Sequence, residues 1–340
     1  MKYPDKALPL ALLFFSTIFL NGCAVAYKST AKVLIGYVED EGVDYFLTTD
    51  DPQSACRMSE TLGPLLLSFG RVTKPPEHLA TILDFLAGVC AEEQAKEAGL
   101  RYLRAIYKKD VTEARDAQIL YKRHMALAAK RELKAYQAMT TVFGDLDSDQ
   151  CPSFRDRHEE LYFMVGLISG IQSLNNDIAA NSAAGVPYNV AYRVLRGSRC
   201  LDNEQWWGVP KSVEAAIELI LPSETPPQVD PYQQLADSAE VGSRMGVNLA
   251  RFLQLQTYYS KGETDHAQDA IRTYVRERKT APANSDARLM DEFAALEIQY
   301  ISDSLWTQAT GSRTPAGGLG TFWDDKPTSK SSLPIDIDGL

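Results

Sequence analysis

The sequence contains few of the residues from which catalytic and metal sites are usually built. Only four of its 340 residues are histidines (His78, His124, His158 and His266), and no two have the i+3 or i+4 spacing of a zinc site. A glycine-rich phosphate loop, a G-x-S-x-G elbow and a C-x-x-C motif are also missing. We therefore expect a non-catalytic protein that works without a cofactor.

Positive charge is also scarce. The chain has 35 Lys and Arg residues against 45 Asp and Glu residues, which gives a formal net charge of −10. An acidic protein is a poor partner for nucleic acid and is not attracted to anionic lipid headgroups. No stretch has the sustained apolar–polar alternation of a β-strand, so the sequence predicts an all-α fold.

The N-terminus has the layout of a secretory signal. Lys2 and Lys6 precede an apolar core, Ala7–Leu20, that is too short to cross a bilayer, since a spanning helix needs about 20 apolar residues. The ending Leu20-Asn21-Gly22-Cys23 resembles a bacterial lipobox, in which the cysteine is lipidated and becomes the first mature residue. Residues 1–22 are then a signal peptide. The alternatives are an ordinary signal peptide with Cys23 as a bystander, or an uncleaved anchor.

The residue after Cys23 bears on where the protein resides. It is Ala24 rather than an acidic residue, which by resemblance to enterobacterial sorting rules favours the outer membrane. Each buried methylene of an acyl chain contributes about 0.8 kcal/mol, so several chains anchor a protein almost permanently. We expect a lipid-anchored protein on the periplasmic side of the outer membrane, or exposed at the cell surface.

Four cysteines remain in the mature chain, which in an oxidising compartment suggests two disulfides. Cys56 and Cys90 lie at equal distances from a break near position 73 that joins two amphipathic segments. Residues placed symmetrically about the turn of an antiparallel hairpin face each other, so we expect these two to pair. Cys151 and Cys200 then pair by elimination. The alternative is four buried free thiols.

Helical patterns continue along most of the chain, with apolar residues at i, i+3, i+4 and i+7. The predicted helical segments are 52–70, the segment after "RVTKPP" from Glu77, 112–143, 152–178, 188–197, 210–221, 232–259, 263–279 and 285–306. They form one helical domain, residues 23–306, of stacked helical hairpins similar to tetratricopeptide repeats. Residues 307–340 are rich in Gly, Pro, Ser and Thr, which predicts a flexible tail.

Acidic residues suggest one weak metal site. Asp145, Asp147 and Asp149 alternate in "DLDSDQCPSFRD", which resembles the opening of a calcium loop, but Gln150 replaces the turn glycine and Asp156 the final Glu. The alternative is a plain acidic turn. The carboxylate pairs Glu92-Glu93, Glu159-Glu160 and Asp324-Asp325 are interpreted as solvated helix faces or tail.

Aromatic residues suggest a second candidate surface. Trp206 and Trp207 are adjacent beside an expected turn, and Tyr258 and Tyr259 end a long helical segment. Adjacent aromatics at a helix boundary can line a pocket or a partner surface, although aromatics at helical spacing are usually core.

Several segments together resemble the T-component lipoproteins associated with tripartite ATP-independent periplasmic (TRAP) transporters. These are the lipobox cysteine, the segment "TTDDPQSACRMSETLGPLLLSFGRVTKPPEHLATILDFLAGVCAEE", the long charged helix at 112–143, and "LMDEFAALEIQYISDSLW". The resemblance covers about residues 23–306. The extra cysteines, the segment "SRCLDNEQWWGVP" and the C-terminal tail depart from the family pattern.

The resemblance implies a tetratricopeptide-like fold, a homotrimer, and a channel or cleft lined by apolar residues. It also implies a periplasmic solute-binding protein as partner, and a ligand destined for an inner-membrane permease. The expected function is thus an accessory role in solute uptake. The alternatives are a scaffold lipoprotein for an envelope machine (a pilus, secretion system or surface filament) and an enzyme with a buried, strongly perturbed carboxylate or histidine in its cleft.

Overall fold

The computed structural model describes residues 25–221 and 229–325, and every regular element within these ranges is helical. The all-α prediction is therefore confirmed. None of the helices in these ranges is long and apolar enough to cross a membrane. Cys23 lies outside the described residues, as do the signal peptide and residues 326–340.

The N-terminal part of the fold is a set of long hairpins. Residues 25–37 form a helix that continues through the π-helical η1 (Val38–Gly42) into α2 (Val43–Leu47). After α3 (Pro52–Ser68) and the 3₁₀ turn η2 (Phe69–Arg71), three longer helices follow: α4 (Glu77–Tyr107), α5 (Val111–Phe143) and α6 (Arg157–Ala179). Each helix from α3 to α6 packs against the next one in the chain.

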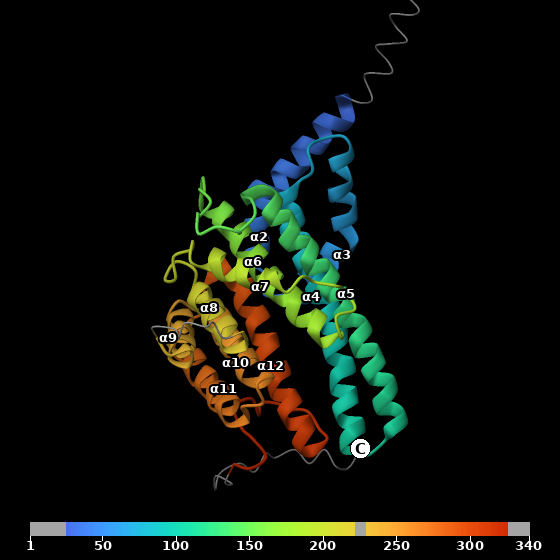
Figure 1. Cartoon of the computed structure of the whole chain (residues 1–340), viewed down its shortest axis with the longest axis vertical. Coiled ribbons are helices and arrows are strands. Elements are labelled where there is room, and N and C mark those ends of the chain that lie inside the picture. Colours follow the sequence, from blue (N-terminus) through green and yellow to red (C-terminus); the bar gives the residue numbers. More distant parts are fainter. Residues whose placement is uncertain (1–24, 222–228, 326–340) are drawn as a thin grey trace, which may run out of the picture.

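The C-terminal part consists mainly of shorter helices. In chain order these are α7 (Asn189–Ser198), α8 (Val209–Ile220), α9 (Pro231–Arg244), α10 (Leu249–Ser260), α11 (Thr264–Arg278), the 3₁₀ turn η3 (Ser285–Ala287) and the longer α12 (Arg288–Thr310). Figure 1 shows α8–α12 gathered beside the long helices α4 and α5. The last helix, α12, returns to pack against α4 as well as α10, so the stack of hairpins closes on itself.

Aspartate side chains begin several of these helices. Asp51, Asp110, Asp156 and Asp230 each accept a hydrogen bond from a backbone N–H in the first turn of α3, α5, α6 and α9, respectively. Such a cap satisfies a donor that would otherwise lack a partner and stabilises a helix by about 1 kcal/mol. Because Asp156 is the N-cap of α6, this helix begins at residue 157 and not, as the sequence predicts, at residue 152.

The predicted disulfides are both present. The Cα atoms of Cys56 and Cys90 are 5.4 Å apart, and those of Cys151 and Cys200 are 5.3 Å apart. The first disulfide joins α3 to α4, as the hairpin symmetry requires. The second joins the loop before α6 to the turn that follows α7. Closing loops of 34 and 49 residues stabilises the fold by roughly 4 kcal/mol each on the chain-entropy estimate.

One predicted helix is broken in the structure. The segment expected as a single helix over 232–259 forms α9 and α10, with a sharp turn at Gly246. The φ angle of Gly246 is +74°, and a Cβ there would lie 2.4 Å from the Pro282 carbonyl oxygen. Only glycine meets both conditions, so this residue ends α9.

The expected tail is partly folded. α12 runs to Thr310, and residues 311–325 turn back onto the helices. Phe322 is buried, and the guanidinium of Arg272 lies 5.0 Å from the centre of its ring. The indole N–H of Trp306 donates to the Thr321 carbonyl oxygen over 3.0 Å. The prediction of a flexible tail from residue 307 is thus wrong for residues 307–325, because Phe322 and Trp323 pack on α11 and α12.

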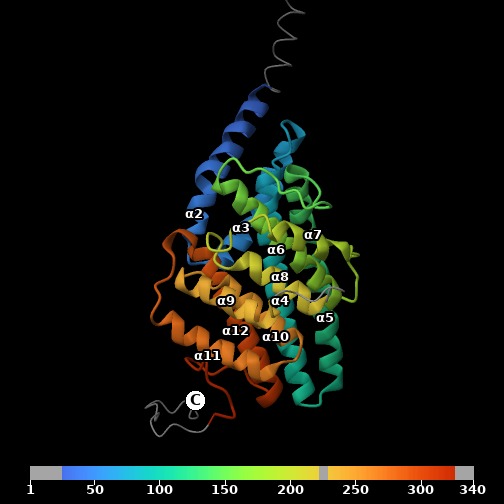
Figure 2. The ribbon, with the colours of Figure 1, turned by 60° about the vertical axis from the view of Figure 1, so that its left-hand side comes forward.

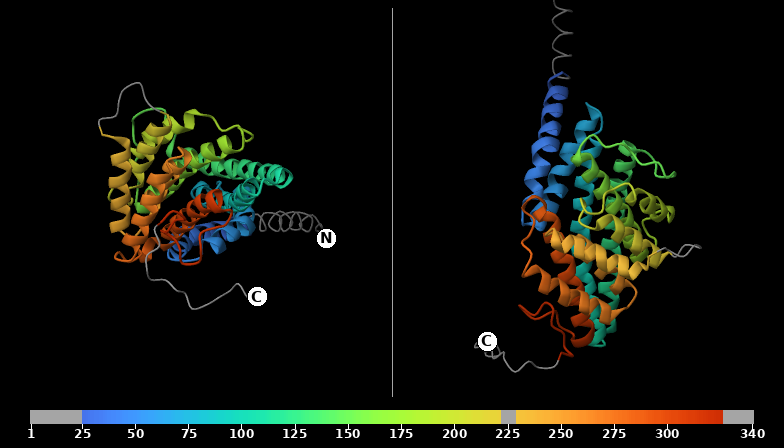
Figure 3. Two further views of the ribbon diagram at one scale, coloured as in Figure 1. Left: turned by 90° about the horizontal axis from the view of Figure 1, so that it is seen from below. Right: turned by 90° about the vertical axis from the view of Figure 1, so that its left-hand side faces the viewer.

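The ends of the described chain lie far apart. Figures 2 and 3 show the helix of residues 25–37 extending from the body at one end, while the segment before residue 325 lies at the other end. If Cys23 carries lipid, the anchor is therefore attached beside this projecting helix and not beside the last turns of α12.

Candidate functional site

The closing of the helical stack leaves a cavity of about 560 Å³. Its walls come from α4, α5, α6, α8, α10 and α12. Much of the wall is apolar and includes Ile171, Val213, Ile217, Phe252, Leu253 and Ile301. A cavity of this volume, apolar with a few converging polar groups, has the size and character of a small-molecule site.

Close packing of α5 and α6 positions one side of the cavity. A Cβ on Gly166 would lie 2.4 Å from Cβ and Cγ of Met139, so α6 approaches α5 more closely than any larger residue allows. Further along the same helix, Asn176 projects toward α4 and α5. The sequence of α6 therefore places a polar amide where this helix meets α4 and α5.

One end of the cavity holds a largely buried cluster of four ionisable side chains and one amide, which we call the carboxylate cluster: Glu92, Lys96, Glu132, Asn176 and Glu297. The Asn176 side-chain amide donates to Glu92 Oε1 over 2.5 Å and to Glu132 Oε2 over 2.8 Å. Lys96 Nζ donates to Glu92 Oε2 over 3.3 Å and also to Glu297. Four helices, α4, α5, α6 and α12, thus meet through one hydrogen-bonded network.

Burial perturbs the acids of this cluster. It raises the pKa of Glu132 well above the ordinary value of 4.5, and the neighbouring Glu92 carboxylate adds to the effect. Burial also raises the pKa of Glu297, against the opposing field of the Lys96 ammonium. The pKa of Lys96 is raised because the favourable fields of Glu297 and Glu92 together outweigh desolvation of its ammonium. Glu132 Oε1 is buried and has no hydrogen-bond partner among the described residues.

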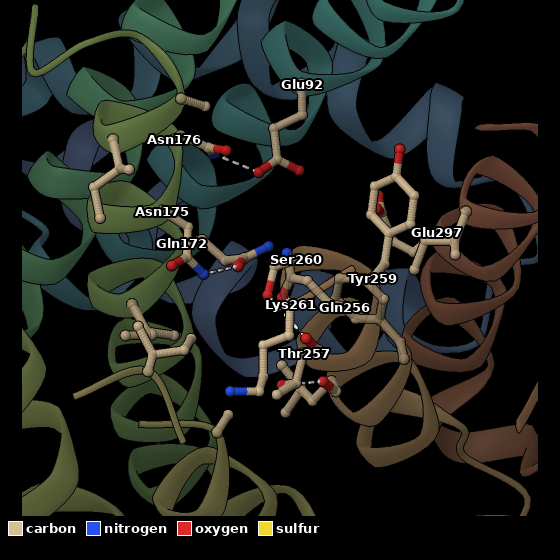
Figure 4. Close-up of a pocket in the computed structure, with 18 of the residues that line it drawn as sticks. Glu92, Gln172, Asn175, Asn176, Gln256, Thr257, Tyr259, Ser260, Lys261 and Glu297 are labelled. Atoms are coloured by element: carbon tan, nitrogen blue, oxygen red, sulfur yellow. Dashed lines mark hydrogen bonds between the residues drawn. The ribbon is translucent and has the colours of Figure 1, made fainter. Parts of the chain in front are cut away.

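Exposed lining residues mark the mouth of the cavity: Ile178, Ile220, Ser260 and Lys261. Figure 4 shows Lys261 on the opposite side of the cavity from Glu92 and Asn176, with Gln172 and Asn175 between them. The two ends of the cavity therefore differ in charge, with a carboxylate-rich buried end and a lysine at the solvent.

Of the four predicted aromatics, one lies at this cavity. Tyr259 lines it, and its hydroxyl accepts a hydrogen bond from the Gln308 side-chain amide over 3.0 Å. Tyr258 points away and is buried, stacking on Tyr232 with 6.0 Å between ring centres. The two tyrosines are consecutive on α10 and so project from different sides of the helix.

The predicted tryptophan surface is mostly core. Trp206 and Trp207 are 1% and 3% exposed, and the Trp206 indole N–H donates to Glu160 over 2.8 Å. They lie at the base of a separate pocket of about 390 Å³ that also contains Asp44 and His158. Side chains this deeply buried leave almost no surface to a partner, so their main contribution is to packing.

The predicted calcium site is not formed. Arg193 makes a two-point contact with Asp147, donating to both carboxylate oxygens over 2.7 Å. This contact also lowers the pKa of Asp147. Within residues 25–221 and 229–325, no group of three or more His, Cys, Asp or Glu side chains could hold a metal ion. Asp145, Asp147 and Asp149 thus belong to an acidic turn, and one of them is neutralised by arginine.

The sequence does not predict the carboxylate cluster, because the pair Glu92-Glu93 has the pattern of a solvated helix face. Glu92 is only 5% exposed, since α4 is covered on several sides by α3, α5, α6 and α12. Glu159 is buried too, and accepts hydrogen bonds from the backbone and side chain of Arg155. The i, i+4 spacing of Glu92 and Lys96 was the available signal, but it is equally typical of exposed helices.

Comparisons of the chain with protein-family models, with curated proteins and with solved structures found no match.

The raised pKa of Glu132 predicts a pH-dependent contribution to stability. The folded protein keeps a proton on Glu132 that the unfolded chain releases above its ordinary pKa of 4.5. This contribution is therefore greatest below pH 4.5 and declines as the pH rises toward the folded-state pKa. In Glu132→Gln, which is neutral at every pH, the free energy of unfolding should decline less between pH 5 and pH 8 than in the wild type.

Urea unfolding followed by circular dichroism at both pH values measures this difference. Glu240→Gln is the matched control, because Glu240 is exposed on α9 and its substitution should leave the pH slope unchanged. Identical slopes for Glu132→Gln and the wild type would contradict a protonated Glu132.

Proposed function

We propose that the chain is a lipid-anchored envelope protein that holds a small, mainly apolar ligand in the cavity between α4 and α12. The observation that carries this proposal is the cavity itself, with its largely apolar walls and its carboxylate-rich buried end. Ligand sites in helical proteins commonly form between packed helices in this way. Exchange of the ligand with a partner protein then takes place at the mouth near Lys261.

A role in solute uptake also requires a partner protein that exchanges the ligand with this cavity. The resemblance to the T-component lipoproteins supports a periplasmic solute-binding protein, docked near the mouth, and a TRAP permease as the final acceptor. It also implies a cleft lined by apolar residues, and the cavity has this character. The proposed location is the periplasmic side of the outer membrane, with lipid on Cys23 and with self-association into a trimer.

The scaffold alternative fits the geometry less well. Repeat scaffolds bind partners along an open concave face. Here α12 packs against α4 and α10, and the space between the helices has the volume of a small-molecule site. Co-purification with a solute-binding protein favours the uptake role, whereas binding along a pilus or secretin favours the scaffold.

One observation favours a second function, acid–base catalysis. Glu132 and Glu297 are buried near the cavity and their pKa values are raised, as is common for catalytic acids. Burial between the four helices that the network joins also accounts for these raised pKa values, as a structural feature. Recovery of an intact ligand after prolonged incubation favours binding, and conversion of that ligand favours catalysis.

Filling the cavity should abolish ligand binding. Ala216 lines the cavity on α8, and Ala216→Phe would place a benzyl group where the ligand lies. We expect the affinity for the apolar fluorophore N-phenyl-1-naphthylamine to fall at least about tenfold, a loss of about 1.4 kcal/mol. Fluorescence titration measures the affinity, and thermal unfolding shows whether the variant is folded.

The control for this variant is Ala309→Phe, which makes the same change at an exposed position of α12. It should bind the fluorophore as the wild type does. Equal affinity in Ala216→Phe and the wild type would mean that the fluorophore binds elsewhere and would remove the main support for this function.

Lipid on Cys23 should hold the protein in the membrane. After expression of the full chain in a bacterium, the wild type should sediment with membranes and its N-terminal peptide should carry the mass of acyl chains. Cys23→Ser should carry no acyl mass. A wild-type peptide without lipid would contradict the anchor and the location together.

A further inference from the structure

We propose that the ligand is an amphipathic organic cation, with its ammonium or guanidinium group beside Lys96 against the Glu92 and Glu297 carboxylates that line the cavity, and with its apolar body against α8 and α10. The proposal rests on the proposed function and specifies the ligand class of the same cavity. It depends on the balance of charges and hydrogen-bond donors in the carboxylate cluster.

The buried end of the cavity has more acids than bases. Among the described residues, α4 and α12 contribute Glu92 and Glu297 to the lining, and α5 contributes Glu132 behind Glu92. Lys96 is the one basic side chain in this network. Even with Glu132 uncharged, two acidic groups face one ammonium. Buried charges are stable only when they are well compensated, so two carboxyl groups that share one ammonium favour an additional positive charge at this end.

Hydrogen-bond donors are also in short supply. The Asn176 amide nitrogen is shared between Glu92 and Glu132, and the Lys96 ammonium is shared between Glu92 and Glu297. A ligand that supplies donors would relieve this shortage, whereas a carboxylate or phosphate would add further acceptors.

Tyrosine rings complete the surroundings of a cation. Tyr121, Tyr259 and Tyr300 all line the cavity at or near this end. The Lys96 ammonium lies 5.7 Å from the centre of the Tyr300 ring, within the range of a cation–π contact. The aromatic walls therefore suit an organic cation with an apolar body more than a hydrated inorganic ion.

The competing arrangement is an anion in the opposite orientation, with its head at Lys261. That lysine is exposed at the mouth, where water and salt screen its charge. Charged groups in the buried end are screened much less and act more strongly on a ligand. The buried carboxylates should therefore decide which sign of charge is preferred.

Three ligands with the same eight-carbon chain separate these possibilities: n-octylammonium, n-octanol and n-octanoate. Each competes with bound N-phenyl-1-naphthylamine on the anchorless wild-type protein. We expect n-octylammonium to bind about 10- to 100-fold more tightly than n-octanol, because its ammonium forms a charge-assisted hydrogen bond that the alcohol cannot form. We expect n-octanoate to bind more weakly than n-octanol.

Glu297→Gln should reduce the preference for n-octylammonium over n-octanol to about threefold or less, while n-octanol still binds. Binding of the neutral alcohol shows that the cavity of the variant is intact. Glu92→Gln is a second variant with the same expectation, in case loss of one Lys96 contact unfolds the first. Glu240→Gln, an exposed site on α9, should keep the wild-type preference.

Two results would overturn the inference and leave the proposed function standing. One is that n-octanoate binds as tightly as n-octylammonium or more tightly, above all if Lys261→Met removes its binding. The other is that n-octanol and n-octylammonium bind equally. If neither the fluorophore nor any of the three compounds binds, the cavity is not a ligand site, and the proposed function fails together with this inference.

Discussion

The buried ammonium of Lys96 joins the first half of the chain to its last helix. It lies between Glu92 on its own helix and Glu297 on α12, more than 200 residues away in the sequence. Through Glu92 and Asn176 the same network reaches α6, and through Glu132 it reaches α5. A charge in this position is costly unless its partners are well placed. The network therefore constrains how α12 can pack, and so determines that the hairpins close around a cavity.

Most of the fold follows from patterns within single segments. The apolar spacing predicts the helices, the symmetry of the hairpin predicts the Cys56–Cys90 disulfide, and both agree with the structure. The exceptions have local physical causes. Gly246 breaks a predicted helix through its positive φ angle, and Phe322 and Trp323 attach part of a polar-looking tail to α11 and α12. A composition rich in Gly, Pro, Ser and Thr says little about order when one aromatic, Phe322, is buried and a second, Trp323, packs against Trp306.

The candidate site was much harder to predict. Glu92, Lys96 and Glu297 are ordinary residues of amphipathic helices, and their burial depends on which helices surround α4, a property of the whole chain. The aromatic pattern predicts Tyr259 as a candidate, but it predicts Tyr258, Trp206 and Trp207 equally, and these three are core residues. Asp147 shows the opposite error, a predicted site that is not formed. Its spacing from Asp145 and Asp149 suits calcium, but its carboxylate is paired with Arg193, 46 residues away in the sequence. Local spacing identifies chemistry that is possible, and tertiary packing decides which of it is assembled.

A double-mutant cycle on Lys96 and Glu297 tests most directly whether their contact closes the fold. Urea unfolding gives the free energy of unfolding for the wild type, Lys96→Met, Glu297→Gln and the double variant. We expect each single change to cost about 3 kcal/mol or more, and the double variant to lose clearly less than their sum, because removing one partner leaves the other charge buried. Losses that add within about 0.5 kcal/mol would contradict a direct contact between the two residues.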